Sequence, residues 1–175
     1  MLPKKIIKKY WKIKLKFKLL KNQIIKKHII IEHNFDINCF NKINFDEYIY
    51  IGPFSFIDAR GGLTIKKGTI IGPRVKIHTF NHRYENSTML PYDNIEIHKP
   101  VYIDLNVWIG SDVTILPGTK INEGVIISAS SVVRGELEKH SIYAGNPAKK
   151  VGNRNIDNYN NLKNKDQIYL INKKY

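Results

Sequence analysis

The sequence predicts an all-β fold, a parallel β-helix in which the chain winds as a coil with three short sides per turn. An aliphatic residue recurs at every sixth position, and a small or β-branched residue follows each of these aliphatics four positions later. Turn-forming residues lie between the two columns. An amphipathic helix would return its apolar stripe every three or four residues, and an antiparallel sandwich would alternate with a period of two. A period of six is typical of stacked coils whose strands pair in parallel.

The period is clearest between residues 101 and 133. The aliphatic column consists of Ile103, Ile109, Ile115, Ile121, Ile127 and Val133. The small or β-branched column consists of Val107, Val113, Thr119, Val125 and Ser131. We expect each bulky aliphatic to point inward and to stack on its equivalent one full coil later, because β-branched side chains suit an extended backbone.

The first half of the chain repeats this period with interruptions. Its aliphatics are Ile31, Ile37, Ile43 and Ile49, then Ile51 and Ile57, then Ile65, Ile71 and Ile77. The register slips by two between Ile57 and Ile65, around "DARGG", which indicates a protruding corner. Residues 80–100, "FNHRYENSTMLPYDNIEIHKP", lose the period and are expected to form a long excursion loop.

Charge and composition divide the chain into three parts. We expect a basic N-terminal arm at 1–30, the β-helix domain at 31–152 with its loop at 80–100, and a polar C-terminal tail at 153–175. The net charge is +14, but residues 1–30 contain eleven lysines and no acid, which leaves 18 basic and 15 acidic side chains elsewhere. The excess charge therefore belongs to the arm. No nucleic-acid-reading motif accompanies it, so no nucleic-acid partner is expected.

The basic arm allows two conformations. Lysines alternate with apolar residues from Trp11 to Leu19, which suits an extended strand, although lysine and leucine are also good helix formers. In either form the arm could rest on an anionic membrane surface, or it could pack its apolar residues on the end of the coil. Peripheral membrane contact through residues 1–30 is thus one of two open alternatives.

Composition also limits the compartment and the kind of site. The single cysteine, Cys39, excludes an internal disulfide framework and a cysteine-based zinc cage. No run of 18 apolar residues exists, and lysines break the short apolar runs near the N-terminus, so neither a spanning helix nor a signal peptide is expected. These features predict a cytoplasmic protein, with the inner face of the membrane as the place of any peripheral contact.

One compound motif carries a resemblance to a known family. The stretch "DLNVWIGSDVTILPGTKINEGVIISASSVV", followed by "SIYAGNPAKKV", resembles the sugar and xenobiotic branch of the hexapeptide-repeat acetyltransferases. The resemblance covers about residues 50–152 and is strongest from 101 to 151. It implies a left-handed parallel β-helix and a homotrimer that binds acetyl-CoA between neighbouring subunits. The turns "IKKG", "INEG" and "ISASS" depart from the family's commoner "IGDN", "IGDG" and "IGAGS" without altering the inward columns.

The resemblance assigns a general base to the excursion loop. In these acetyltransferases the histidine of an "NHR" segment is the base, which places the role on His82. Histidine suits the role because its unperturbed pKa lies near working pH. A lone loop histidine is otherwise most often a surface residue. We expect His78 to have a packing role and His98 to be structural or solvent-facing.

The resemblance also assigns the binding of the acyl donor. Backbone N–H groups at Gly110 and Ser111 would meet the thioester and its oxyanion. The residues expected to line the acetyl-CoA slot are Trp108, Ala129, Arg134, Lys149 and Lys150. Relatives usually have threonine in place of Arg134. Alternatively, Trp108 is a large residue at a coil edge, and the two lysines are simply solvated.

The acceptor is expected to contact the loop and the "DARGG" corner. The residues assigned to it are Asp58, Arg60, Asn81, Arg83 and Tyr84. Arginine and aspartate side chains can hydrogen-bond a sugar, but Asp58 and Arg60 could equally pair with each other at the surface.

These assignments predict an acetyl-CoA-dependent O-acetyltransferase acting on a carbohydrate hydroxyl, in polysaccharide or glycolipid biosynthesis, by direct attack on the thioester. N-acylation of an amino sugar is the close alternative. A non-enzymatic hexapeptide scaffold and a γ-type carbonic anhydrase are the remaining alternatives. The second would place zinc on three histidines, and the spacing of His78, His82 and His98 does not fit its pattern, so no metal is expected.

Overall fold

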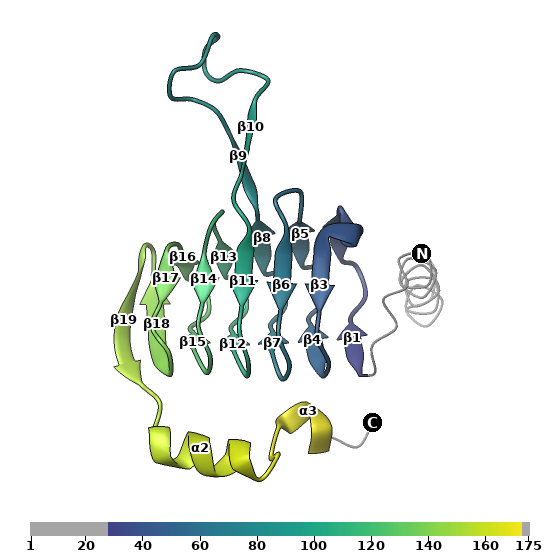
Figure 1. Ribbon diagram of the computed structural model, residues 1–175, viewed down its shortest axis with the longest axis vertical. Helices are drawn as coiled ribbons and strands as arrows, with labels where there is room; N and C mark the ends of the chain where they lie inside the picture. Colours follow the sequence, from purple (N-terminus) through teal and green to yellow (C-terminus); the bar gives the residue numbers. More distant parts are fainter. Residues whose placement is uncertain (1–27, 173–175) are drawn as a thin grey trace.

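The computed structural model describes residues 28–172, which wind into a triangular prism of parallel β-strands (Figure 1). Successive strands of the chain belong to three different sheets in turn, so that three short strands complete one coil. The architecture confirms the expected left-handed parallel β-helix. The basic arm predicted at residues 1–30 lies outside the described residues, apart from residues 28–30.

The three sheets form the three faces of the prism, named here faces A, B and C. Face A consists of β1 (Ile29–Ile31), β4 (Ile49–Ile51), β7 (Ile70–Ile71), β12 (Trp108–Ile109), β15 (Ile126–Ile127), β18 (Ser141–Gly145) and the antiparallel β19 (Ala148–Asn153). Face B consists of β2 (Asp36–Asn38), β5 (Phe56–Asp58), β8 (Lys76–His78), β13 (Thr114–Ile115) and β16 (Val132–Val133). Face C consists of β3 (Ile43–Phe45), β6 (Leu63–Ile65), β11 (Val101–Ile103), β14 (Lys120–Ile121) and β17 (Glu136–Leu137). A single 3-10 turn, η1 (Phe40–Lys42), precedes β3.

The inward aliphatic column confirms the prediction from the six-residue period. On face A, Ile109 pairs with Ile71 on one neighbouring coil and with Ile127 on the other. All three are 0–1% exposed. The core is therefore a stack of isoleucine layers, and burying each side chain contributes roughly 1.5–3 kcal/mol relative to leaving it in water.

The corners between faces define three edges of the prism. Edge AB joins face A to face B and includes Gly52, Gly72, Gly110-Ser111 and Ser128-Ala129. Edge BC includes residues 58–62, 79, 116–118 and 134–135, and edge CA includes residues 46–48, 66–68, 104–106, 122–124 and 138–140. On edge AB each of five coils turns through one residue of positive φ, and these residues are Asn34, Phe54, Arg74, Asp112 and Ser130.

The predicted excursion at 80–100 is confirmed, and it contains a hairpin. Strands β9 (Phe80–His82) and β10 (Glu96–His98) pair antiparallel, with His82 opposite Glu96. The hairpin leaves the prism at edge BC and projects far beyond it (Figure 1). The chain re-enters the prism at β11, so the excursion is an insertion between two sides of a single coil.

The C-terminal segment differs from the expected polar tail. Residues after Asn153 form two helices, α2 (Ile156–Asn164) and α3 (Tyr169–Asn172), which run along the prism on the side away from the hairpin (Figure 1). Tyr159 and Leu170 are the buried anchors of these helices. The segment is short of apolar residues, and two buried side chains at distant positions give little periodicity in the sequence. Among residues 28–172, no helix is long and apolar enough to span a membrane.

Candidate active site

His82 lies on β9, at the root of the hairpin. Its imidazole stacks on the ring of Tyr92, with a centroid separation of 4.0 Å and an interplanar angle of 12°, and meets the edge of Phe80 at 5.8 Å. Nδ1 is buried without a hydrogen-bond partner among the described residues. Nε2 is also without such a partner but is not buried, so it is the ring nitrogen that a substrate can reach.

A shallow pocket of about 240 Å³ opens in front of this histidine at edge BC. Its lining consists of His78, Phe80, Asn81, His82, Leu116 and Pro117. Burial lowers the pKa of His78 below its ordinary value, and the neighbouring Asp58 carboxylate only partly opposes this effect. His78 is therefore held neutral beside the pocket near pH 7, in keeping with a packing role.

Arg60 fastens the hairpin to the prism. Its guanidinium donates to both carboxylate oxygens of Asp58, at 3.1 Å from Nε and 2.9 Å from Nη2, and pairs with Glu96 of β10 through Nη1. The same guanidinium lies 3.5 Å from the ring centroid of Phe80 on β9. One side chain of the "DARGG" corner thus contacts both strands of the hairpin.

Asp58 is only 4% exposed. Burial by itself raises the pKa of Asp58, but the hydrogen bonds from the side chain and backbone of Arg60 outweigh it and lower the pKa below its ordinary value. Of the two arrangements that the sequence left open for Asp58 and Arg60, the structure has the ion pair between them.

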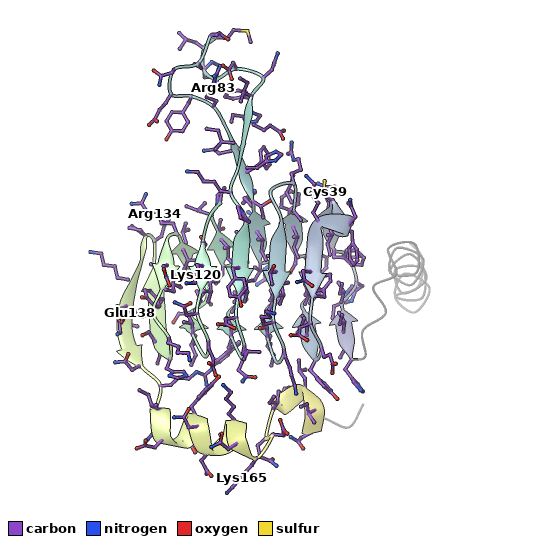
Figure 2. The ribbon with its side chains drawn as sticks, viewed as in Figure 1. Cys39, Arg83, Lys120, Arg134, Glu138 and Lys165 are labelled. Atoms are coloured by element: carbon purple, nitrogen blue, oxygen red, sulfur yellow. The ribbon has the colours of Figure 1, made fainter. Side chains whose placement is uncertain are left out.

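The outer part of the hairpin, where Arg83 lies (Figure 2), is organised around a second ion pair. Arg83 Nε donates to Asp93 Oδ2 at 2.9 Å, and the backbone N–H groups of Thr88 and Ile95 donate to the same carboxylate. The Arg83 hydrogen bond brings the pKa of Asp93 to about 2. Arg83 therefore links the outgoing side of the hairpin to Asp93 on its returning side.

Asn81 and Tyr84 keep surface that a ligand can reach. Asn81 is exposed on β9, and its Oδ1 accepts the backbone N–H of His82 at 2.9 Å, which leaves the amide nitrogen available. Tyr84 is 62% exposed. These two residues lie on either side of Arg83 in the sequence, one residue and two residues from His82.

Edge AB has a glycine, and therefore backbone without a side chain, on three successive coils. A Cβ on Gly72 would lie 2.9 Å from Ser111 N, and one on Gly110 would lie 2.7 Å from Ala129 N. Glycine is therefore required where one coil approaches the next. The N–H groups of Ser111 and Ala129 donate to no backbone acceptor among the described residues, whereas the Gly110 N–H, which was also expected to meet the oxyanion, donates to Ile127 O at 2.8 Å. The edge thus offers two open N–H donors on adjacent coils.

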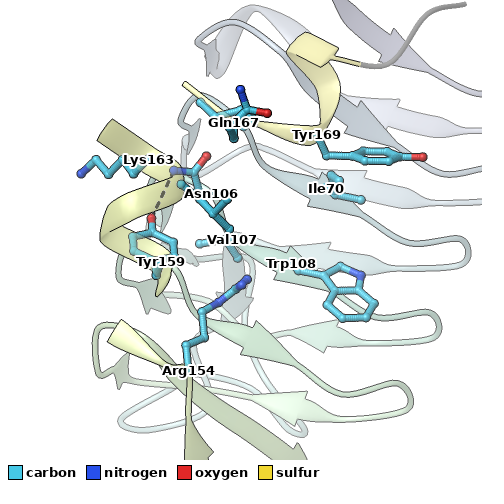
Figure 3. A pocket seen from close by; sticks show the side chains of 12 residues that line it. Ile70, Asn106, Val107, Trp108, Arg154, Tyr159, Lys163, Gln167 and Tyr169 are labelled. Atoms are coloured by element: carbon cyan, nitrogen blue, oxygen red, sulfur yellow. Dashed lines mark hydrogen bonds between the residues drawn. The ribbon is translucent and has the colours of Figure 1, made fainter. Parts of the chain in front are cut away.

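The remaining residues expected to bind the acyl donor are spread over the prism. Trp108 is 53% exposed on face A, beside a cleft formed with the C-terminal helices (Figure 3). Arg134 lies on the edge from which the hairpin projects (Figure 2) and lines a pocket with Leu116 and Pro147. On β19, Lys149 is exposed, whereas Lys150 Nζ pairs with Glu138 at 2.7 Å.

Within one chain these groups do not all converge. His82 leaves the prism at edge BC, whereas Gly110, Ser111 and Ala129 lie on edge AB, at the other side of face B. Within residues 28–172 no three His, Cys, Asp or Glu side chains are placed to hold a metal ion, and His98 Nε2 contacts Glu96 at 3.0 Å.

The structure adds two residues to the site that the sequence did not indicate. Tyr92 stacks on His82, and Glu96 links Arg60 to the hairpin. Both lie in the stretch that lost the period, where no repeat position marks which side chain faces which. Only the antiparallel pairing of β9 and β10 brings them to His82.

Comparison with known proteins supports the expected family. Residues 100–135 match the family described as "Bacterial transferase hexapeptide (six repeats)". The chain is 34% identical over 114 residues to the putative lipopolysaccharide biosynthesis O-acetyl transferase WbbJ of Escherichia coli (strain K12), covering 61% of this chain and 58% of that protein. It is 33% identical over 117 residues to a dTDP-4-amino-4,6-dideoxy-D-glucose acyltransferase of Escherichia coli, covering 64% and 61%. The chain thus spans about three fifths of the length of these two relatives.

The fold has a close counterpart among solved structures. The hexapeptide-repeat-containing acetyltransferase VCA0836 from Vibrio cholerae O1 biovar eltor, complexed with acetyl-CoA, superposes with a TM-score of 0.67 at 21% identity, over 80% of this chain and 77% of that one. This likeness bears on the fold. Taken together, the repeats, the relatives and the coiled architecture show that the chain is similar to the hexapeptide-repeat acetyltransferases.

Proposed function

We propose that the protein transfers an acetyl group from acetyl-CoA to a hydroxyl group of a carbohydrate, in the assembly of a polysaccharide or glycolipid. The observation that carries the proposal is the chemistry at two edges of the prism. An imidazole with an open Nε2 lies at edge BC, and two open backbone N–H donors lie at edge AB. A base and an oxyanion site are what acyl transfer from a thioester requires.

The chemical step follows from these groups. His82 Nε2 accepts the proton of the sugar hydroxyl as its oxygen attacks the thioester carbon. The carbonyl oxygen becomes an oxyanion, which accepts hydrogen bonds from the N–H groups of Ser111 and Ala129. The carbon–sulfur bond then breaks, the ester bond to the sugar is complete, and the imidazolium returns its proton to the sulfur of CoA.

Because His82 and Ser111 lie on different edges of one chain, this step needs two copies of the chain. We propose a homotrimer in which edge AB of one subunit faces the hairpin root of the next. Acetyl-CoA would lie in the groove between them, flanked by Gly110 and Ala129, with Arg134, Lys149 and Lys150 as cations for its phosphates. Of these cations Lys150 is already paired with Glu138, which makes Arg134 and Lys149 the stronger candidates. Trp108, also expected at the donor slot, lines the separate cleft formed with the C-terminal helices.

The acceptor is proposed to lie over the pocket in front of His82. Asn81 and Tyr84 have free polar and aromatic surface there and suit a sugar ring. Asp58, Arg60 and Arg83 were also expected to contact the acceptor, but the carboxylate of Asp58 and the guanidinium groups are engaged in ion pairs. We therefore propose that these three hold the hairpin in place and that the acceptor meets Asn81 and Tyr84.

N-acylation of an amino sugar is the second candidate. One of the two relatives compared above is named as an acyltransferase of a 4-amino sugar nucleotide. The same base and the same N–H donors would serve an amine, because the nucleophile differs only in the atom that loses a proton.

The lysine-rich residues 1–30 carry a separate proposal about location, with the body of the protein in the cytoplasm. Eleven lysines without an acid would hold the protein at an anionic membrane, near lipid-linked sugars. Sedimentation with anionic and neutral vesicles at low and high salt tests this proposal. Equal recovery in the supernatant with both kinds of vesicle would contradict it.

The function is tested by release of CoA thiol from acetyl-CoA across a panel of sugars and amino sugars. Wild-type protein should release thiol with at least one acceptor, and mass spectrometry of the product identifies an ester or an amide. The His82→Ala variant should be nearly inactive with that acceptor. Equal thiol release by both proteins would remove His82 from the mechanism.

A further inference from the structure

Face A and the C-terminal helices enclose a cleft that the proposed acyl transfer does not use. This cleft, named here the CA cleft, has a volume of about 240 Å³ and lies beside edge CA. Its polar and aromatic lining includes Asn106, Trp108, Arg154, Tyr159, Lys163 and Tyr169 (Figure 3). Apolar floor is supplied by Ile70 and Val107 of face A and by Leu162 of α2.

Arg154 is a cation in this cleft without a counter-ion. Its Nε donates to the backbone oxygen of Gly124 at 2.6 Å, and its guanidinium lies 5.7 Å from the ring centroid of Tyr159. No carboxylate of the described residues lies within ion-pair distance. Within residues 28–172 the two Nη groups have no hydrogen-bond partner, and they are not buried, so they face the open cleft (Figure 3). Partial burial of an unpaired guanidinium is costly unless an anion joins it.

Arg154 contacts the backbone of Gly124, and the preceding residue, Glu123, has a carboxylate that other side chains already engage. Glu123 accepts from Lys139 Nζ at 2.8 Å, from the Tyr159 hydroxyl at 3.0 Å and from Lys163 Nζ. The charges that surround His140 are accordingly three cations, those of Lys139, Lys163 and Arg154, and one carboxylate. Around His140, next to Arg154 and Tyr159, positive charges therefore outnumber negative ones.

The other end of the cleft is aromatic. Trp108 points outward from β12 and is 53% exposed, although an indole is among the side chains that gain most from burial. It lies on the lining of a concave surface, where a flat ring can stack on it while remaining linked to a group near Arg154. Gln167 lies in the lining between α2 and α3, and its side-chain amide can hydrogen-bond the edge of such a ring (Figure 3).

We propose that the CA cleft is a nucleotide-binding site. The phosphate would pair with the guanidinium of Arg154, and the base would stack on the indole of Trp108. Guanidinium groups match phosphate geometry in a bidentate fork, and bases stack well on aromatic side chains. The site is distinct from the proposed acyl-donor groove, because Arg154 lies by edge CA whereas the N–H donors of Ser111 and Ala129 lie on edge AB. Trp108 lies on the face between the two.

The proposal is tested by calorimetric titration of the full-length protein with uridine 5′-monophosphate, uridine, inorganic phosphate and CoA. Uridine 5′-monophosphate should bind, and uridine and phosphate alone should each bind at least tenfold more weakly. Arg154→Met should weaken binding of the monophosphate at least tenfold, and Arg154→Lys should restore part of it. Arg74→Met is the matched control, because Arg74 is an exposed arginine on another edge. It should bind as the wild type does.

Trp108→Leu is the second variant, since an exposed position tolerates the change, and it should weaken binding of the monophosphate as well. Undetectable binding at millimolar concentration, equal affinity of Arg154→Met and wild type, or binding of phosphate as tight as that of the nucleotide would each overturn the site. So would displacement of the nucleotide by CoA, with Arg154→Met weakening both ligands equally, because the cleft would then be one end of the donor groove. The titration needs no acyl transfer, so it succeeds or fails independently of the enzymatic proposal.

Discussion

The imidazole of His82 lies flat against the ring of Tyr92, 4.0 Å away and nearly parallel. The two residues are ten apart in the sequence, and the antiparallel pairing of β9 with β10 brings the start and the far side of the excursion together. Stacking restricts rotation of the imidazole about its χ angles. It also keeps Nε2 on the side of the ring that is not buried. Tyr92 is thus placed to orient the proposed base.

Removal of the Tyr92 ring should therefore lower turnover with little effect on substrate binding. Tyr92→Ala is expected to reduce kcat by about tenfold to a hundredfold, since small misplacements of a catalytic group are costly. Tyr92→Phe keeps the stacked ring and should retain most activity. Steady-state kinetics separates the two effects, and a rise in KM at constant kcat for Tyr92→Ala would argue for an acceptor-binding role instead.

His82→Ala should reduce kcat by about a hundred- to ten-thousandfold, which is the range for loss of a general base. Binding of CoA, measured by calorimetry, should change little, because the donor groups lie on edge AB. His33→Ala is the control histidine, since His33 lies on the first described coil. Undiminished kcat in the His82 variant, with the control also active, would show that another group accepts the proton.

Arg60→Met should loosen the hairpin while the prism stays folded. The change removes the link to Asp58, the link to Glu96 and the contact with Phe80, so we expect a lower Tm, faster proteolysis between residues 84 and 91, and about tenfold lower kcat. Arg74→Met breaks a pair with Asp112 in which both partners are largely exposed, and it should leave all three quantities near those of wild type. An unaltered proteolysis pattern in Arg60→Met would contradict the anchoring role.

Glu123 should make docking of α2 depend on pH. Burial alone raises the pKa of Glu123, but hydrogen bonds from Lys139, Lys163 and Tyr159 bring it from 4.5 to about 2. Because the pKa of Glu123 is lower in the folded state than in the unfolded state, its ionised carboxylate stabilises the fold at pH values above the unfolded pKa. This stabilisation is lost as the pH falls from 4.5 through about 2. The protection factors of the α2 amides, which correct for the pH dependence of intrinsic exchange, should fall across this window in the wild type.

Glu123→Gln should exchange rapidly in α2 already at pH 7 and should show a weaker pH dependence between those values. Glu136→Gln serves as its control, because Glu136 pairs with Lys120 on an exposed face. If α2 of Glu123→Gln were as protected as that of wild type at pH 7, the carboxylate would not be what holds the helix.

Gly110→Ala should destabilise the prism by about 1–3 kcal/mol, the usual cost of inserting a methyl group into a filled space. The added Cβ would lie 2.7 Å from Ala129 N and 2.9 Å from Ile127 O. Gly152→Ala is the matched control, because its nearest neighbour would be the tip of Ile142 at 3.9 Å. Urea unfolding of both variants measures the difference, and equal stability would mean that edge AB yields more easily than its close backbone approach implies.

The inward columns could be predicted from the sequence because each layer repeats a local rule. Ile109, Ile115 and Ile121 occupy equivalent places on three successive faces, and each place demands the same buried aliphatic. The same period marked where the excursion begins and ends. His82 was reached by resemblance, and its role stays a prediction until the kinetics are measured.

The contacts around His82 could not be predicted in the same way. Tyr92 and Glu96 lie in a segment with no repeat, and the orientation of their side chains depends on how two short strands pair. Glu123 appeared to be only a departure from the usual corner residues. Its partners Tyr159 and Lys163 lie 36 and 40 residues further along the chain, and no local pattern relates them.

The sequence by itself determined the coil, its period, its inward layers and the length of the excursion, because these follow from which side chains can be buried at regular steps along an extended chain. The tertiary structure alone decided that the C-terminal segment is helical and docked on edge CA, that Arg60 ties the hairpin to the prism, and that Arg154 faces an open cleft. Those features rest on ion pairs and hydrogen bonds between residues far apart in the chain. Such interactions depend on distances of a few ångströms in space, which a spacing of residues along the chain does not specify.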